Sequence, residues 1–369
     1  SFFTLEQTMS RIPLWVCVFL FIFSTIAHAQ SGVTDVEAAV AYCKTAFSES
    51  TQADERLSCF DRIQLTADAG QAETPKKTDS EDCKNASDKP CRYLDRKWRL
   101  SSSESKDLTD LETHGLNYLV VTKTSNPNHI ASSPRHLDGV DRNLDNQDLK
   151  FQVSFKTELM RSIPFVRDLP YVDTSRIWAA YTQQSYWQVF DGKNSRPMRE
   201  HNFSPEIILS LGLKSPSGGE RQAWLPRMAN LGFIHESNGR SMPISRSWNR
   251  FYIESAWEIN DNLSVSFRPW WRVNESGRND DNPDIDKFIG YGDMKLHWDQ
   301  LFKNVSANLL FRNNFRSDNK AYTKLDLQYQ PFDRDNIKLH LMLSDGYGES
   351  LIDYNHAQTV FGFGVSIGE

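Results

Sequence analysis

Long hydrophobic runs are almost absent from this sequence of 369 residues, whose formal net charge is -6 and whose mean hydropathy is -0.57. After an apolar segment at residues 12–26, no run approaches the ~20 apolar residues that a membrane helix needs. A bundle of membrane helices is therefore excluded. A soluble secreted esterase would need a G-x-S-x-G motif at a strand-turn-helix elbow. The sequence matches that pattern at residues 364–368, but the match lies in the alternating segment that closes the chain, which argues against such an esterase.

Cysteine is scarce and confined to the first quarter of the chain. Cys17 lies in the apolar segment, and Cys43, Cys59, Cys83 and Cys91 follow it. Four cysteines in an exported protein form a disulfide framework with three possible connectivities. We favour Cys43–Cys59 and Cys83–Cys91, and in each case the disulfides would hold only the N-terminal region.

The N-terminal segment has the parts of a secretory signal peptide. Arg11 precedes the apolar run at 12–26, and the tripeptide AHA after it is a small-x-small cleavage site. We predict a signal peptide at residues 1–29, in which residues 1–8 are possible upstream sequence, and a mature chain that begins at Gln30. An uncleaved anchor helix is the alternative.

Three regions follow the predicted signal peptide. Residues 30–70 show alanine-rich helical spacing, which predicts a small helical region. Residues 71–110 are mostly polar and predict a linker. Residues 111–369 differ from both, because segments of ~10 residues alternate apolar and polar side chains between turn residues, as in membrane β-barrels.

The alternation recurs often enough to predict a complete barrel. In "LKFQVSFK", residues 149–156, Leu149, Phe151 and Val153 share one face, and polar residues share the other. We count about twelve such strands and predict an all-β fold, a twelve-stranded antiparallel transmembrane β-barrel with a small helical, disulfide-containing N-terminal extension. A soluble β-sandwich is the alternative, but it would not need 12% aromatic residues or a uniform apolar face.

Connections at one end of the predicted barrel are longer than those at the other, which contains short turns such as 260–262 and 331–335. Outer-membrane barrels have long external loops and short periplasmic turns. The sequence therefore predicts a Gram-negative outer-membrane protein with external loops near 125–146, 190–203, 238–246, 275–286, 315–319 and 345–356.

Polar residues occur on the apolar face of two neighbouring strands. Leu231 and Phe233 point to the lipid side, so the period of two places His235 and Ser237 there as well. The same count on the next strand places Asn249 on that face. If the hairpin closes symmetrically, His235 lies opposite Asn249 with Cβ atoms ~5 Å apart.

Such an arrangement forms a Ser-His-Asn triad. Ser237 would be the nucleophile, His235 the general base and Asn249 the residue that orients the imidazole. A neutral amide avoids most of the desolvation cost of a carboxylate that faces hydrocarbon. The alternative is structural, because Asn238-Gly239 is also a turn signal and polar residues near a rim often lie among lipid headgroups.

The segment "HESNGRSMPISRSWNR", residues 235–250, closely resembles the active-site segment of the outer-membrane phospholipase A family. The resemblance extends through "YTQQSYWQ", "RPMREHNFSPEI", "DDNPDIDKFIGY" and "GYGESLIDYN", from about Leu116 to the end. It implies a phospholipase A1/A2 that hydrolyses acyl esters of phospholipids and lysophospholipids through Ser237, His235 and Asn249. A channel or adhesin barrel with a degenerate site is the alternative.

The resemblance further implies a calcium site and an oxyanion donor. Calcium would be bound by the carbonyl of Arg240 and the hydroxyl of Ser245 on one subunit and by Ser195 of the other, with the N–H of Gly239 facing the oxyanion. Asp281 matches an acidic residue linked with calcium in the family, although a solvated acidic loop is an equal interpretation. The family motif often has an acidic residue where this chain has Met242, which removes one potential ligand.

The family is active as a homodimer in the membrane plane. Gln183 falls on the lipid face of its predicted strand and matches the family's interface glutamine, so the resemblance implies that two copies hydrogen-bond there; a contact with headgroups is the alternative. Membrane phospholipids and a second copy are the expected partners. We expect no nucleic-acid partner and expect the catalytic residues to lie toward the outer leaflet.

Overall fold

The structure is a computed structural model that describes residues 92–100, 110–166, 168–193, 195–196, 198–214, 224–277, 280–331 and 336–368. The predicted signal peptide, the helical region at 30–70 and all five cysteines lie outside the described residues. Among the described residues, no helix is long and apolar enough to cross a membrane.

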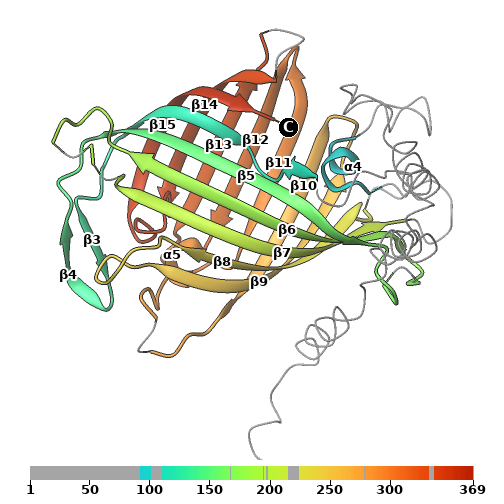
Figure 1. The fold of residues 1–369 in the computed structure, drawn as a ribbon, viewed down its shortest axis with the longest axis horizontal. Coiled ribbons are helices and arrows are strands. Elements are labelled where there is room, and N and C mark those ends of the chain that lie inside the picture. The colour runs from blue at the N-terminus through green and yellow to red at the C-terminus, as the bar shows by residue number, and fades with distance from the viewer. Residues whose placement is uncertain are drawn as a thin grey trace, which may run out of the picture. The chain divides into compact units, whose positions relative to one another are not determined.

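One antiparallel sheet contains thirteen of the described strands, and a pairing between β5 and β6 closes it into a barrel (Figure 1). Its strands are β1 (Leu111–Thr113), β2 (Asn117–Thr124), β5 (Gln147–Arg161), β6 (Val172–Trp187), β7 (Glu200–Leu213), β8 (Met228–Ser237), β9 (Ser247–Glu258), β10 (Leu263–Val273), β11 (Gly292–Phe302), β12 (Val305–Asn313), β13 (Ala321–Tyr329), β14 (Ile337–Tyr347) and β15 (Ala357–Ile367). Strands β1 and β2 pair with successive parts of β5 and fill one position. The described barrel therefore has the twelve predicted positions, which rules out the β-sandwich.

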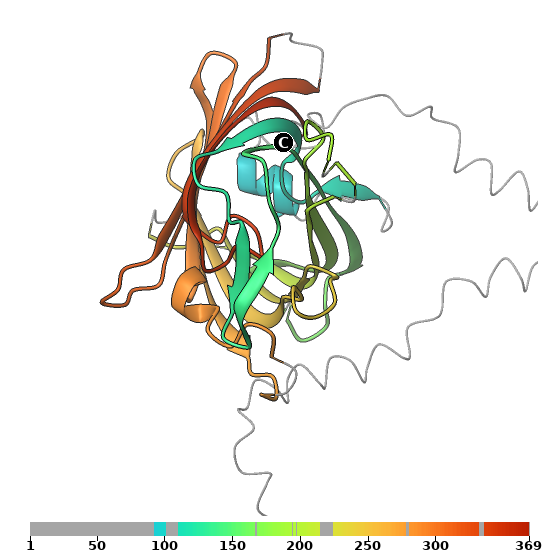
Figure 2. The ribbon, with the colours of Figure 1, turned by 90° about the vertical axis from the view of Figure 1, so that its left-hand side faces the viewer.

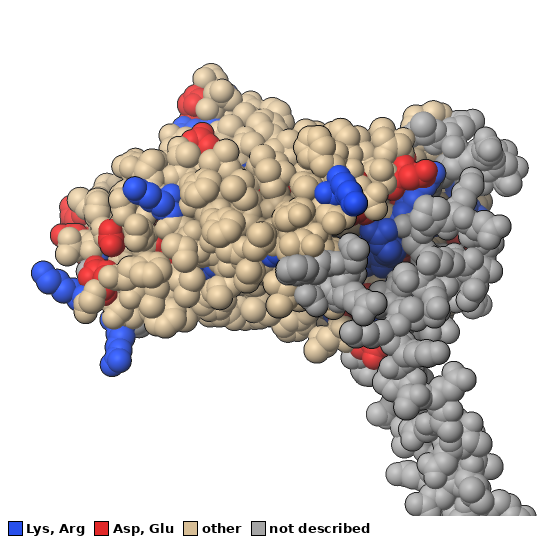
Figure 3. Space-filling model, turned by 90° about the horizontal axis from the view of Figure 1, so that it is seen from above, with Lys and Arg blue, Asp and Glu red and all other residues tan. Residues whose placement is uncertain are grey.

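Burial is inverted relative to a soluble protein. The lysines Lys150 and Lys156 are 1% and 0% exposed in the lumen, whereas Phe361 and Phe363 are 49% and 54% exposed on the outside. Figure 3 shows the flank of the barrel almost without charge, with Lys, Arg, Asp and Glu gathered toward its ends. An apolar band with polar ends is the surface that a membrane-spanning barrel needs.

The loop end of the barrel carries the connections that were predicted to be external. Strand ends place them at 125–146, 188–199, 238–246, 274–291, 314–320 and 348–356, within a few residues of the prediction. The first contains a hairpin of β3 (Ile130–Ser133) and β4 (His136–Asp141), and the fourth contains helix α5 (Asp286–Ile289). We call this end the rim.

The opposite end contains helix α4 (Tyr93–Trp98), which lies inside the ring of strands (Figure 2). Leu94 and Trp98 pack in one buried cluster with Trp178 and Ile208 of the barrel wall. The range 71–110 was predicted as a linker, so this helix was not expected from the sequence. Its apolar residues make the segment from 93 to 98 part of the barrel core.

Candidate active site

The hairpin of β8 and β9 brings the three predicted catalytic residues to the rim. The register pairs His235 with Asn249 and Ser237 with Ser247, as the symmetric hairpin requires. Buried residues alternate along both strands, and Ile234 and Trp248 point into the lumen. His235, Ser237 and Asn249 have the opposite parity and are partly exposed on the outer side, together with Phe233 and Phe251.

A hydrogen bond joins the histidine to the asparagine. His235 Nδ1 lies 2.8 Å from Asn249 Oδ1, and an amide oxygen can only accept, so Nδ1 carries the proton and Nε2 is left with a lone pair. On the same outer face, two residues further from the rim, the ring centroids of Phe233 and Phe251 lie 4.9 Å apart. These rings form an apolar surface next to the imidazole. Ser237 follows His235 by two residues on the same face of β8, so an imidazole and a hydroxyl share one side of the barrel.

The side chain of Asn238, predicted from the sequence only as part of a turn signal, bridges the backbone of the loop 238–246. Its Oδ1 accepts the backbone N–H groups of Arg240 and Arg246 at 3.2 and 3.0 Å, and its Nδ2 donates to the carbonyl of Ile244 at 2.8 Å. Asn238 is 1% exposed. Three bonds from one buried amide fix the path of the loop that follows Ser237.

Gly239 occupies a position where only glycine fits easily. Its φ is +62°, in the left-handed region, and a Cβ there would lie 3.0 Å from Cε2 of Phe203. The backbone N–H of Gly239 donates no hydrogen bond within the described residues. A free N–H two residues after Ser237 is the kind of donor that an oxyanion needs.

The three predicted calcium ligands lie in two neighbouring rim loops. Arg240 and Ser245 are in the loop 238–246, and Ser195 is in the loop 188–199, where its carbonyl accepts the indole N–H of Trp187 at 2.8 Å. A guanidinium N–H of Arg240 donates to the Met198 carbonyl at 2.6 Å and links the two loops.

These residues fit a hard cation in their chemistry. The carbonyl oxygen of Arg240 and the hydroxyls of Ser245 and Ser195 have no hydrogen-bond partner among the described residues, and such neutral oxygens are ligands that Ca²⁺ accepts. Asp281 is partly buried in the loop 274–291 and forms no hydrogen bond or ion pair with another described residue. Within the described ranges, no group of three or more His, Cys, Asp or Glu could hold a metal.

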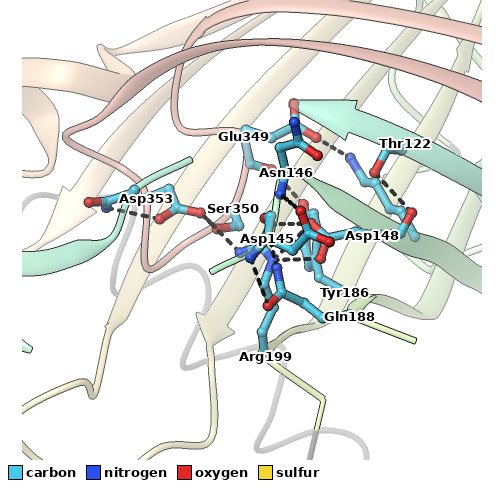
Figure 4. A network of polar contacts seen from close by, with 12 residues as sticks. Thr122, Asp145, Asn146, Asp148, Tyr186, Gln188, Arg199, Glu349, Ser350 and Asp353 are labelled. Atoms are coloured by element: carbon cyan, nitrogen blue, oxygen red, sulfur yellow. Dashed lines mark hydrogen bonds and ion pairs between the residues drawn. The ribbon is translucent and has the colours of Figure 1, made fainter. Parts of the chain in front are cut away.

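Ion pairs inside the rim hold the loop 188–199 in place (Figure 4). Arg199 contacts Asp148 of β5 at 2.8 Å and Asp353 of the loop 348–356 at 3.3 Å, and Arg142 contacts Asp353 at 2.6 Å. Burial alone would raise the pKa of Asp353, but the two guanidinium groups outweigh it and hold the pKa below its usual range. The loop that carries Ser195 is therefore tied to the barrel by charged groups.

Gln183 lies on the outer side of β6, as predicted, but its amide already has partners. The Tyr181 hydroxyl donates to its Oε1 at 3.0 Å, and its Nε2 donates to the Ser185 hydroxyl at 3.1 Å. Ser185 is in turn 2.9 Å from Nδ1 of His201. The chain thus presents a short outward row of polar side chains, which a lipid-facing strand tolerates when each member is hydrogen-bonded.

Glu275 contacts one of the predicted catalytic residues, and no sequence pattern pointed to it. It lies in the loop after β10, and its Oε1 accepts a hydrogen bond from Nδ2 of Asn249 at 3.0 Å. The loop has no regular periodicity, so only the structure could place this carboxylate beside the triad.

Comparisons with known proteins show which family this chain resembles. The family model "Phospholipase A1" matches residues 94–367. Phospholipase A1 of Escherichia coli (strain K12) is 35% identical over 261 residues, which cover 70% of this chain and 82% of the relative. Phospholipase A1 of Salmonella typhimurium is 34% identical over the same shares.

Solved structures give the same result. The outer-membrane phospholipase A of Escherichia coli superposes with a TM-score of 0.59 at 33% identity, over 70% of this chain and 98% of that one. A Salmonella typhi outer membrane phospholipase, solved as a dimer with bound calcium, gives a TM-score of 0.59 at 33% identity, over 70% and 93%. These relatives and the barrel agree with the predicted outer-membrane location. Since the family model and the relatives match the rim loops, the β8–β9 hairpin and nearly all of the barrel, this chain belongs to the phospholipase A1 family, which confirms the predicted enzyme class.

Proposed function

We propose that this protein is a calcium-dependent outer-membrane phospholipase that hydrolyses acyl esters of phospholipids and lysophospholipids from the outer leaflet. The observation that carries the proposal is the 2.8 Å contact between His235 and Asn249 on the outer face of a barrel, with Ser237 on the same face. Further support comes from a solved relative, an Escherichia coli enzyme whose active-site mutant has an asparagine replaced by alanine; it superposes with a TM-score of 0.60 at 32% identity, over 72% of this chain and 95% of that one.

In the proposed mechanism, Ser237 Oγ attacks the carbonyl carbon of the acyl ester while Nε2 of His235 takes its proton. Asn249 accepts the Nδ1–H bond and keeps the imidazole oriented. The tetrahedral oxyanion receives a hydrogen bond from the Gly239 N–H. Collapse expels the glycerol alkoxide, which takes the proton from His235, and the acyl group stays on Ser237.

Water completes the cycle. His235 takes a proton from a water molecule that attacks the acyl-enzyme carbonyl, and collapse of the second intermediate returns the proton to Ser237 and releases the fatty acid. Arg240, Ser245 and Ser195 would hold Ca²⁺, which supplies positive charge near the oxyanion when bound. Asp281 would be a further candidate ligand from the loop 274–291.

Activation by dimerisation is part of the proposal, because an outward nucleophile surrounded by lipid would otherwise attack its own membrane continuously. Ser195 of one subunit would complete the calcium site of the other. In the dimer, Gln183 would give up a hydrogen bond to Tyr181 or Ser185 and form one with the second copy instead. The Gln183→Ala variant should reduce calcium-dependent cross-linking and activity together. Unchanged cross-linking would remove Gln183 from the interface.

The test is lipid hydrolysis by refolded protein in mixed micelles. Ser237→Ala should lower hydrolysis by roughly 10⁴-fold or more, as in other serine hydrolases. Ser247→Ala, which changes the serine paired with Ser237 across the hairpin, is the matched control and should keep activity. A chelator should suppress the wild-type rate and calcium should restore it. Equal fatty-acid release by Ser237→Ala and wild type would refute the proposal.

A further inference from the structure

The amide of Asn249 is engaged at both of its polar ends. Its Oδ1 lies 2.8 Å from Nδ1 of His235, and its Nδ2 donates to Oε1 of Glu275 at 3.0 Å. The backbone explains the second contact. Val273, the last residue of β10, pairs directly with Asn249, and Glu275 follows it by two residues, so it continues the outward side that Trp271, 53% exposed, already occupies.

The chemistry of a carboxylate gives this contact a direction. An ionised carboxylate accepts hydrogen bonds and donates none, so Glu275 can bind only the NH₂ end of the amide. A flipped Asn249 would turn its oxygen toward the carboxylate and its NH₂ toward the imidazole. Glu275 therefore holds Oδ1 toward His235, which keeps the proton on Nδ1 and the lone pair on Nε2.

Within the described part of the chain, Glu275 has no other hydrogen bond and forms no ion pair; its one partner is Asn249. A carboxylate in a purely structural role would normally contact a cation or several N–H groups. Its negative charge would also help to stabilise the imidazolium of His235. The neutral amide of Asn249 does this less than the aspartate of a Ser-His-Asp triad does.

We propose that Glu275 is a positioning residue of the hydrolysis, a fourth member behind Ser237, His235 and Asn249. It fixes the amide of Asn249, thereby selects the tautomer of His235, and places a negative charge behind the amide as the imidazolium forms. This inference rests on the proposed function. Because Glu275 is partly exposed and its charge is partly screened by solvent, we expect an effect of about tenfold, the lower end of what loss of an orienting outer partner costs around metal-bound histidines.

The test compares Glu275→Ala, Glu275→Gln and Asn274→Ala, the last being an exposed neighbour in the same loop. Hydrolysis in mixed micelles at saturating calcium gives kcat and KM, and the rate of inactivation by an alkyl sulfonyl fluoride reports the reactivity of Ser237 without turnover. Glu275→Ala should lower kcat and the inactivation rate about tenfold and leave KM unchanged. Glu275→Gln keeps an acceptor oxygen and should fall between Glu275→Ala and wild type, while Asn274→Ala should match wild type.

A double-mutant cycle separates positioning from general damage. In an Asn249→Ala background, Glu275→Ala should have no further effect, because its contact to the triad is already gone. Additive losses, a change confined to KM, or wild-type kcat and inactivation rates in Glu275→Ala would each overturn the inference. If Ser237→Ala is inactive and Glu275→Ala is fully active, only this inference fails; an active Ser237→Ala removes the proposed function itself.

Discussion

The barrel contains two histidine–asparagine pairs that are nearly identical as pairs and differ in everything around them. His235 and Asn249 face each other across β8 and β9, and His297 and Asn308 do so across β11 and β12. The Nδ1–Oδ1 distances are 2.8 and 2.7 Å. The pair itself is thus an ordinary product of antiparallel register, which brings opposite side chains within hydrogen-bond reach.

The surroundings decide which pair can do chemistry. The lumenal His297 is stacked on Tyr93 of α4 with ring centroids 3.6 Å apart, and its Nε2 lies 3.4 Å from a carboxylate oxygen of Asp299. The residue two positions after the histidine is Asp299 in this pair and Ser237 in the other. The covered ring of His297, beside a carboxylate, helps to stabilise the α4 end of the barrel. The open ring of His235 lies on the same face as the Ser237 hydroxyl, whose proton it would accept.

Removing each histidine should separate the two pairs most strongly. We expect His235→Ala to lower phospholipid hydrolysis by roughly 10⁴-fold, because the general base is lost. His297→Ala should hydrolyse lipid at a rate near wild type. The measurement is fatty-acid release by refolded protein in mixed micelles with calcium. Comparable losses in both variants would mean that the lumenal pair contributes to activity.

Removal of the two asparagines should produce a smaller difference in kcat than removal of the two histidines. Asn249→Ala leaves the imidazole in place without its orienting partner, so we expect a loss of roughly 10²-fold, within the range for general acid–base catalysis. Asn308→Ala should leave kcat unchanged. If the two variants have the same kcat, orientation by an amide is not needed in this site.

The stacking ring should affect stability and not catalysis. Tyr93→Ala removes the stacking on His297, the hydrogen bond from Lys97 and packing against the buried cluster of α4, so it should lower the free energy of unfolding by about 1–3 kcal/mol. Urea unfolding in detergent measures it, and kcat provides the control. An activity loss at unchanged stability would contradict a purely structural role for the lumenal pair.

The last prediction is that a serine beside the lumenal histidine–asparagine pair restores no hydrolysis, which tests whether the hydroxyl must face the outside of the barrel. Asp299→Ser in a Ser237→Ala background recreates a serine two residues after a histidine–asparagine pair, but in the lumen. We expect no recovery of hydrolysis, since acyl chains do not reach that side of the wall. Recovery would show that substrate enters the barrel.

The alternation of apolar and polar residues was sufficient to predict the barrel, its number of strands and the rim loops, because period two and lipid exposure leave a repeated pattern. The same parity placed His235, Ser237 and Asn249 on the outer face, and the register agrees. Their catalytic roles, the calcium ligands and the function of Gln183 are still predictions.

Other features lay outside the reach of such patterns. Helix α4 has fewer than two turns and lies in a polar segment, so its apolar contacts with Trp178 and Ile208 could not be inferred from periodicity. Asn238 and Glu275 make their contacts from irregular loops. The partner of a loop side chain depends on tertiary structure, and local sequence periodicity does not predict it.

The inverted burial has a practical consequence for work with this protein. The amines of Lys150 and Lys156 lie in the lumen. Lys150 donates a hydrogen bond to Glu349 at 2.5 Å, and Lys156 donates one to the carbonyl of Lys97. An acylating reagent added from outside should modify both amines in the unfolded chain and neither in the closed barrel. Mass spectrometry of these two side chains would therefore count correctly assembled molecules in a refolding mixture, whether or not those molecules are active.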